Sequence, residues 1–222
     1  MVAWLKNEFW NGYTAFEKIF FAAMIALQAI VYCFAPDSII GIICGIAGCA
    51  CVALTAKGKI SSYIFNFIQM ITYMIICWDA ALYFEFGEQV FYFGACVVGV
   101  FLWNKNMNAE TAQVKCQKMK LWQWCAVIAA TAFTTGLLGA FGEFVLGGTL
   151  PYLDAFSVAL AVIAQILMVL RYREQWAIWI LIDITSLVMF VILGNWSMVA
   201  MYIAWTINAV YGWYNWTKLA KN

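Results

Sequence analysis

Long apolar stretches recur along the chain, separated by short segments that hold most of its polar and charged residues. Each stretch is close to the length of about 20 residues that a helix needs to cross the hydrocarbon core of a bilayer. Alternating barrel strands would not produce such long apolar runs, so each stretch is predicted to be a helix. The predicted fold is all-α, a polytopic membrane bundle of about eight transmembrane helices. The expected spans are residues 17–35, 38–56, 61–82, 86–104, 121–146, 152–170, 175–193 and 196–217.

The composition agrees with a lipid-facing exterior. Hydrophobic residues make up 66% of the 222 residues and charged residues only 10%, whereas a soluble domain is about a quarter charged. No basic run indicates a nucleic-acid partner, so the expected surroundings are the lipid bilayer. Histidine is absent, which removes the commonest metal ligand and proton relay. We therefore expect no metal, no cofactor, no catalytic residue and no enzymatic activity. Most of the eight cysteines lie in apolar stretches, where free buried thiols are expected.

The positions of the charges give an independent test of this division into spans. All twelve basic residues lie near the N-terminus, near the C-terminus or in alternate loops: Lys6, Lys18, Lys57, Lys59, Lys105, Lys115, Lys118, Lys120, Arg171, Arg173, Lys218 and Lys221. The other loops and the helix ends beside them carry acidic residues and no Lys or Arg: Asp37, Glu85, Glu88 and Asp154. With eight spans, the positive-inside rule places every basic group, and both termini, in the cytoplasm.

A faint internal repeat relates residues 36–105 to residues 151–218. Gly99, Trp103 and Lys105 are each followed, 113 residues later, by a residue of the same type or charge, at Gly212, Trp216 and Lys218. The predicted division is an extra N-terminal helix (1–35), a three-helix bundle (36–105), a loop and linker helix (106–150) and a second three-helix bundle (151–222). The odd number of helices in each bundle makes the two bundles parallel. Transporters built on parallel repeats bind substrate between the repeats, near the bilayer midplane.

Polar and aromatic residues inside the spans are the candidates for function, because polar groups are costly in hydrocarbon. Trp176, Trp179, Asp183 and Ser186 are spaced by three, four and three residues, which places them on one helical face. Asp183 is the strongest candidate, since an ionised carboxylate in mid-span requires a partner, water or a ligand. A structural hydrogen bond to a neighbouring helix is the alternative. The predicted substrate-binding set is Asn66, Gln69, Gln89, Trp176, Trp179, Asp183, Ser186, Tyr202, Trp205, Asn208 and Tyr211.

The tryptophans fall into two groups. Those at span ends are typical of aromatic belts at the membrane–water interface: Trp103, Trp122, Trp124, Trp196, Trp213 and Trp216. Trp179 and Trp205 instead share a helical face with an intramembrane polar residue. Aromatic faces beside amides and a carboxylate suit a flat heterocycle, and a cationic ring gains further from the aromatic faces.

The stretch from Gln175 to Asp183 resembles the WxxWxxxN signature of the PnuC family of nicotinamide riboside transporters. The last span, with Tyr202, Trp205 and Asn208, is similar to the closing helix of that family. The resemblance covers residues 36–218 and implies a fold plan shared with the SWEET sugar transporters. It also implies facilitated diffusion of nicotinamide riboside across a bacterial inner membrane. One departure is that Asp183 stands where the signature has Asn; a carboxylate there could pair with the cationic nicotinamide ring or, when protonated, donate a hydrogen bond.

Individual residues count against some of the alternative functions. A SWEET-like sugar carrier is the nearest alternative, but spans 38–104 and 152–217 lack the internal prolines that those carriers use as hinges. A retinal protein needs a lysine deep in its last helix, and span 196–217 has none. Transport of another vitamin or nucleoside, and assembly into a homo-oligomer, stay open at this point.

Overall fold

The computed structural model describes residues 6, 8–34, 38–79, 81, 83–146, 151–192 and 196–221, and within this part the chain is almost entirely helical. The long helices are α2 (Ala15–Phe34), α3 (Ile39–Lys57), α4 (Ser62–Asp79), α5 (Tyr83–Lys105), α6 (Leu121–Phe141), α7 (Pro151–Val169), α8 (Gln175–Ile192) and α9 (Trp196–Leu219). A short π-helical segment, η1 (Gly142–Leu146), extends α6, and two short strands, β1 (Met107–Asn108) and β2 (Gln113–Val114), form a hairpin after α5.

These helices confirm the eight predicted spans to within a few residues at each end. A helix satisfies its own backbone hydrogen bonds, which a segment in hydrocarbon must do. Among the described residues, four helical segments are long and apolar enough by themselves to cross a membrane: Ala15–Phe34, Ile39–Lys57, Glu85–Lys105 and Leu121–Val145. Of the predicted charge pattern, Asp37 and the side chain of Asp154 lie outside the described residues.

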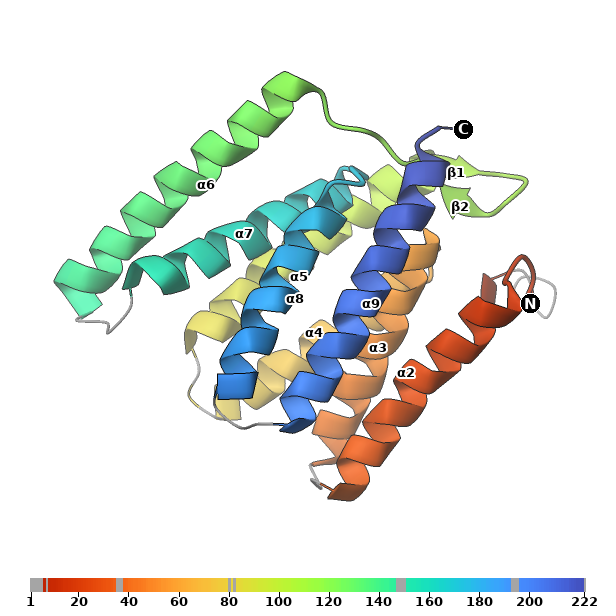
Figure 1. Cartoon of the computed structure of the whole chain (residues 1–222), viewed down its shortest axis with the longest axis horizontal. Coiled ribbons are helices and arrows are strands. Elements are labelled where there is room, and N and C mark those ends of the chain that lie inside the picture. The colour runs from red at the N-terminus through yellow and green to blue at the C-terminus, as the bar shows by residue number, and fades with distance from the viewer. Residues whose placement is uncertain are drawn as a thin grey trace.

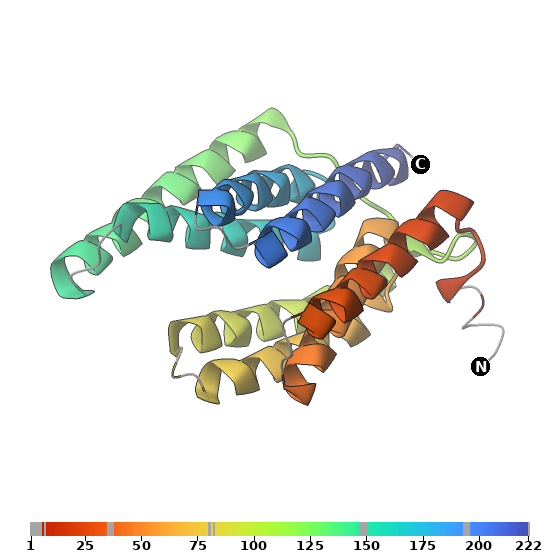
Figure 2. The ribbon, with the colours of Figure 1, turned by 60° about the horizontal axis from the view of Figure 1, so that its bottom comes forward.

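The helices form two layers, which Figures 1 and 2 show from two directions. The first layer holds α2 to α5 and the second holds α6 to α9. Within the layers, α4 packs against α3 and α5, and α8 packs against α7 and α9. Between the layers, α3 packs against α9 and α5 packs against α7. In terms of the two predicted three-helix bundles, or triplets, the first helix of each thus contacts the third helix of the other.

Two matched hydrogen bonds join the layers at the end of the bundle where α3, α5, α7 and α9 end, which we call the basic end. The indole Nε1 of Trp103 donates to the carbonyl oxygen of Met168 at 3.2 Å, and that of Trp216 donates to the carbonyl oxygen of Thr55 at 2.8 Å. Trp216 follows Trp103 by 113 residues, and Met168 follows Thr55 by the same number. One contact is therefore made twice, once in each direction across the interface.

Close packing onto glycine repeats at the same offset. The ring of Tyr63 in α4 lies so near Gly99 in α5 that a methyl group on Gly99 would overlap it. The ring of Trp176 in α8 lies against Gly212 in α9 in the same way. Each of these rings also meets a tryptophan edge-on, with centroids 5.1 Å apart for Tyr63 and Trp103 and 5.8 Å apart for Trp176 and Trp216.

The prediction that Trp103 and Trp216 belong to interfacial belts is wrong. Both side chains are fully buried, and their rings contact each other with centroids 5.6 Å apart. The core accommodates them because each indole N–H finds a carbonyl at the end of a helix in the other layer. Trp122 is 65% exposed, as a belt residue would be, and the side chain of Trp196 lies outside the described residues.

The N-terminal helix α2 packs along α3 and also contacts α9, while α6 packs along α7. Many large apolar side chains on the outside of the bundle are exposed, among them Ile19, Phe101 and Phe133. An exterior of this kind faces lipid rather than water.

Candidate functional site

Asp183 lies in the middle of α8, in the helical bundle. Its side chain is buried, with 6% of the residue exposed. Among the described residues its carboxylate has no hydrogen-bond or ion-pair partner, although Tyr202 of α9 is close enough to feel its charge. A buried carboxylate is costly unless something pairs with it, so this group is available to a ligand.

The seam between α8 and α9 brings further predicted residues to Asp183. The hydroxyl groups of Ser186 and Tyr202 interact across this seam. The ring of Tyr202 then meets the ring of Trp205 at 75°, with centroids 5.2 Å apart. The carboxylate, two hydroxyl groups and two aromatic rings are therefore held together by one pair of adjacent helices.

Trp205 and Asn208, one turn apart on α9, carry buried polar atoms without partners. The indole Nε1 of Trp205 is buried beside the thiol of Cys49, a weak acceptor, and makes no hydrogen bond of ordinary length to the described residues. Asn208 is 2% exposed; its Nδ2 donates to the carbonyl oxygen of Val52 at 3.2 Å, but its Oδ1 accepts no hydrogen bond from any described residue. Buried polar atoms are nearly always paired, so an orphaned donor and an orphaned acceptor on one face indicate a place for a ligand.

A second polar group lies between α4, α5 and α7. The amides of Asn66 and Gln165 both donate to the thiol sulfur of Cys96, each at 3.2 Å. A thiol is a weak acceptor, so either amide can turn to a better one at little cost. Gln165 was not among the predicted residues. It is buried, and its signal in the sequence is an uncharged amide within a mostly apolar span.

The two polar groups meet at α3. Cys51 lies close enough to Cys96 for their thiols to interact electrostatically, and the next residue, Val52, accepts the hydrogen bond of Asn208. The predicted residues Asn66, Asp183, Ser186, Tyr202, Trp205 and Asn208 are therefore held by helices that meet in the interior of the bundle.

The remaining predicted residues have different surroundings. Gln69 is half-buried and lies against Gly48 of α3, and Gln89 is buried in the first half of α5. Trp179 is half-buried and packs between the two hydrophobic clusters of the interior. Trp176 is a core residue at the basic end, where it packs on Gly212.

Tyr211 is drawn to a different polar cluster. Its hydroxyl donates to the carboxylate of Glu17 in α2, which forms an ion pair with Lys57 at the end of α3. Edge-on packing against Phe21 of α2, with ring centroids 5.9 Å apart, holds Tyr211 in this position. The structure therefore separates Tyr211 from Asp183 and assigns its hydroxyl to a contact between helices.

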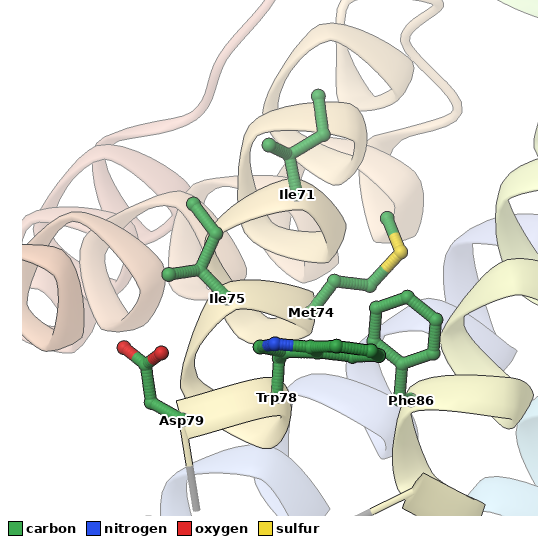
Figure 3. Close-up of a pocket in the computed structure, with 6 residues that line it drawn as sticks. All are labelled: Ile71, Met74, Ile75, Trp78, Asp79 and Phe86. Carbon is green, nitrogen blue, oxygen red and sulfur yellow. The ribbon is translucent and has the colours of Figure 1, made fainter.

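A surface pocket of about 330 Å³ lies at the opposite end of the bundle from the basic end, between α4 and α5 (Figure 3). Apolar side chains line it, with the ring of Trp78 beside that of Phe86 at a centroid distance of 5.5 Å. Asp79 lies at its rim and is exposed. None of the predicted substrate-binding residues lines this pocket, so it is separate from the interior polar groups.

Comparison with known proteins finds a family and several relatives that this chain resembles. The family model described as "Nicotinamide mononucleotide transporter" matches residues 38–218. Two curated relatives are each described as "Nicotinamide riboside transporter PnuC". The relative from Neisseria mucosa is 36% identical over 99% of this chain and 88% of its own length, and that from Haemophilus influenzae is 37% identical over 100% of this chain and 98% of its own.

A solved structure is similar along the whole chain. The protein in the "Crystal structure of the Vitamin B3 transporter PnuC" is 35% identical to this chain, and the alignment covers 100% of this chain and 98% of that one. The TM-score of 0.84 shows that the two chains share one fold.

Proposed function

The chain belongs to the nicotinamide mononucleotide transporter family, and from this premise we propose that it carries nicotinamide riboside across the inner membrane of a bacterium. Support comes from relatives that carry that name and match nearly the full chain at 36% and 37% identity. The single observation in the interior that carries the proposal is the buried, unpaired carboxylate of Asp183 beside aromatic rings. A flat cationic ring satisfies both features at once.

The charges favour the riboside over its 5′-phosphate. Every Lys and Arg of the chain lies in a terminal segment, in a loop or in the first or last turn of a helix. A phosphate inside the bundle would lie away from every cationic side chain and near the like charge of Asp183. We infer that the substrate brings a positive ring and neutral sugar hydroxyls into the interior.

Each interior group has a role in this proposal. Asp183 pairs with the positive charge of the pyridinium ring, which stacks against Trp179 or Trp205. The carboxamide oxygen of the ring can accept a hydrogen bond from the orphaned Nε1 of Trp205. The carboxamide nitrogen can donate one to the orphaned Oδ1 of Asn208. The amides of Asn66 and Gln165 turn away from the thiol of Cys96 and bind ribose hydroxyls. Gln89, in the first half of α5, binds a further hydroxyl of the ribose.

The transport step follows from the two matched triplets. We propose that residues 36–105 and 151–222 are parallel repeats with residues 106–150 as linker, and that they rock against each other to expose the site alternately. The contacts that recur at an offset of 113 residues support this division. The described spans hold no series of ionisable side chains across the bundle, and we propose uncoupled, facilitated diffusion. The basic end, with both termini, is then cytoplasmic.

A binding and transport panel tests this function. Purified protein is titrated with nicotinamide riboside, nicotinamide mononucleotide, adenosine and glucose, and uptake of each labelled compound into liposomes is measured. We expect the riboside to bind most tightly and the mononucleotide at least tenfold more weakly, since tenfold corresponds to about 1.4 kcal/mol.

Two results would overturn the proposal. Equal binding of riboside and mononucleotide would contradict the assignment by charge, and preferred binding of glucose would favour a SWEET-like sugar carrier. Uptake that requires a sodium or proton gradient would contradict facilitated diffusion while leaving the substrate assignment intact.

A further inference from the structure

The two seams at which the layers meet are covered differently. The seam between α3 and α9 is bridged by α2, which contacts both helices. The matching seam lies between α7 and α5, and the helix next to it, α6, packs along α7 on the other side of the bundle from α2 (Figure 1). A groove of about 500 Å³ is open between α5 and α7.

The groove is apolar and accessible from outside the bundle. Its walls include Phe91, Gly94 and Val98 from α5 and Ile166, Val169 and Leu170 from α7. Val98 is 53% exposed and Ile166 is 41% exposed, so this part of the lining faces the surroundings, whereas Val169 belongs to the core. A Cβ atom at Gly94 would meet no atom of the described residues within 4 Å, so the groove is open at this position.

Cationic groups lie where the groove reaches the basic end. Lys105 ends α5 and Arg171 follows α7, and the bond from Trp103 to Met168 ties these two helix ends together. Lys105 is exposed and forms no ion pair with the described residues. One Nη of Arg171 donates to the carbonyl oxygen of Lys115 at 2.8 Å, while its Nε is buried and has no hydrogen-bond partner in the part of the chain that the structure describes.

The adjoining segment adds to this positive charge. Residues 105–120 contain four lysines, at positions 105, 115, 118 and 120, and one acidic residue, Glu110 at the turn of the hairpin. Lys115, Lys118 and Lys120 are exposed. Basic pockets beside membrane helices bind anionic lipid headgroups, and each nearby cation contributes about 1 kcal/mol.

We propose that this groove is a binding site for an anionic phospholipid: an acyl chain lies along α5 and α7, and the phosphate meets Lys105 and Arg171. The acyl chain then covers the seam between α5 and α7, as α2 covers the matching seam between α3 and α9. The charge at one end of the groove selects this occupant over a second copy of the protein, whose exterior at this depth is equally apolar. A lipid in this place touches both triplets and therefore affects their relative movement.

Native mass spectrometry of the purified protein tests the site, using phosphatidylglycerol and phosphatidylcholine with identical acyl chains as probes. We expect the first phosphatidylglycerol to bind at least tenfold more tightly than phosphatidylcholine. In Lys105→Gln this preference falls severalfold, whereas binding of phosphatidylcholine stays the same. In Gly94→Leu the backbone has room for the new Cβ, the longer side chain occupies part of the groove, and both lipids are expected to bind more weakly.

Two matched variants serve as controls. Lys221→Gln removes an exposed cation from the same end of the bundle, and Gly136→Leu adds a side chain at an open position on α6. Both are expected to bind lipid as the unchanged protein does. Equal lipid preference in Lys105→Gln and Lys221→Gln would overturn the proposal. Unchanged lipid binding in Gly94→Leu, with or without a change in oligomeric mass, would overturn it as well.

Discussion

Lys57 of α3 and Glu17 of α2 form a buried ion pair in which the lysine Nζ lies 2.7 Å from one carboxylate oxygen and 2.8 Å from the other. The two side chains are only 8% and 7% exposed. Tyr211 of α9 donates to the same carboxylate, and the backbone N–H of Thr14 donates to its second oxygen at 2.7 Å. One carboxylate therefore ties the N-terminal helix to both helices of the seam that it covers.

Replacement of one partner of this pair is expected to destabilise the protein strongly. Lys57→Met leaves the charge of Glu17 buried without its cation, which costs about 3–5 kcal/mol. The double variant Lys57→Met with Glu17→Gln removes both charges and is expected to recover most of that loss. Thermal or denaturant unfolding in detergent measures both. Lys221→Met removes an exposed cation from the same end of the bundle; it is the control and is expected to change stability by less than about 0.5 kcal/mol. An equal loss in this control would contradict the role of the pair.

Asp183→Asn is expected to weaken binding of nicotinamide riboside about tenfold, because it removes the negative charge and keeps the shape of the side chain. The reduced riboside, whose ring is uncharged, should bind this variant as well as it binds the unchanged protein. Isothermal titration of both compounds gives the comparison. Asp79→Asn removes an exposed carboxylate and should leave both affinities unchanged. An equal loss for the charged and uncharged ligands would show that Asp183 acts through hydrogen bonding alone.

Trp205→Phe tests the orphaned indole donor. The variant keeps an aromatic ring beside Tyr202 and loses Nε1, so we expect a loss of about 1 kcal/mol, or roughly fivefold in affinity for the riboside. Trp122→Phe changes an indole that is 65% exposed and should have no effect. If Trp205→Phe bound the riboside as tightly as the unchanged protein, the carboxamide would have to lie elsewhere.

The packing of rings on Gly99 and Gly212 predicts that a glycine-to-alanine substitution destabilises the protein at these two positions but not at an open position. Alanine at either position pushes into Tyr63 or Trp176 and is expected to cost about 1–3 kcal/mol. Alanine at Gly136, which has open space, is expected to be neutral or slightly stabilising, since alanine is the better helix former. Unfolding midpoints of the three variants decide this. Similar losses at Gly99 and Gly212 would also support the matched contacts of the two triplets.

The thiol of Cys116 is expected to resist water-soluble reagents. Cys116 lies in the segment after the β-hairpin, outside the spans, and is 8% exposed. Burial raises the pKa of this thiol, so little of the reactive thiolate is present at pH 8. A charged maleimide should label it only after denaturation in SDS. Rapid labelling of Cys116 in intact protein would show that the segment opens readily.

Part of the candidate site can be predicted from the sequence and part cannot. Asp183 and the residues around it on α8 and α9 were predicted because neighbouring helices in sequence also pack together, so helical spacing was sufficient. Gln165 was missed because its place in the polar group depends on contacts with Cys96 and Asn66, which lie on helices distant from it in the sequence. Tyr211 was placed with Asp183 by its spacing along α9, yet its hydroxyl is held by Glu17 of α2, a pairing that no periodicity along a single helix reveals.

The sequence by itself determined where the helices lie and which ends carry the positive charge. The reason is that each polar residue placed in hydrocarbon has its own free-energy cost, whatever the other helices do. Only the tertiary structure decided which faces meet. Trp103 and Trp216 look like belt residues in the sequence, but they become core residues because each indole reaches a carbonyl in the opposite layer. Contacts of this kind depend on the relative position of two helices, and that position is set by packing across the whole bundle.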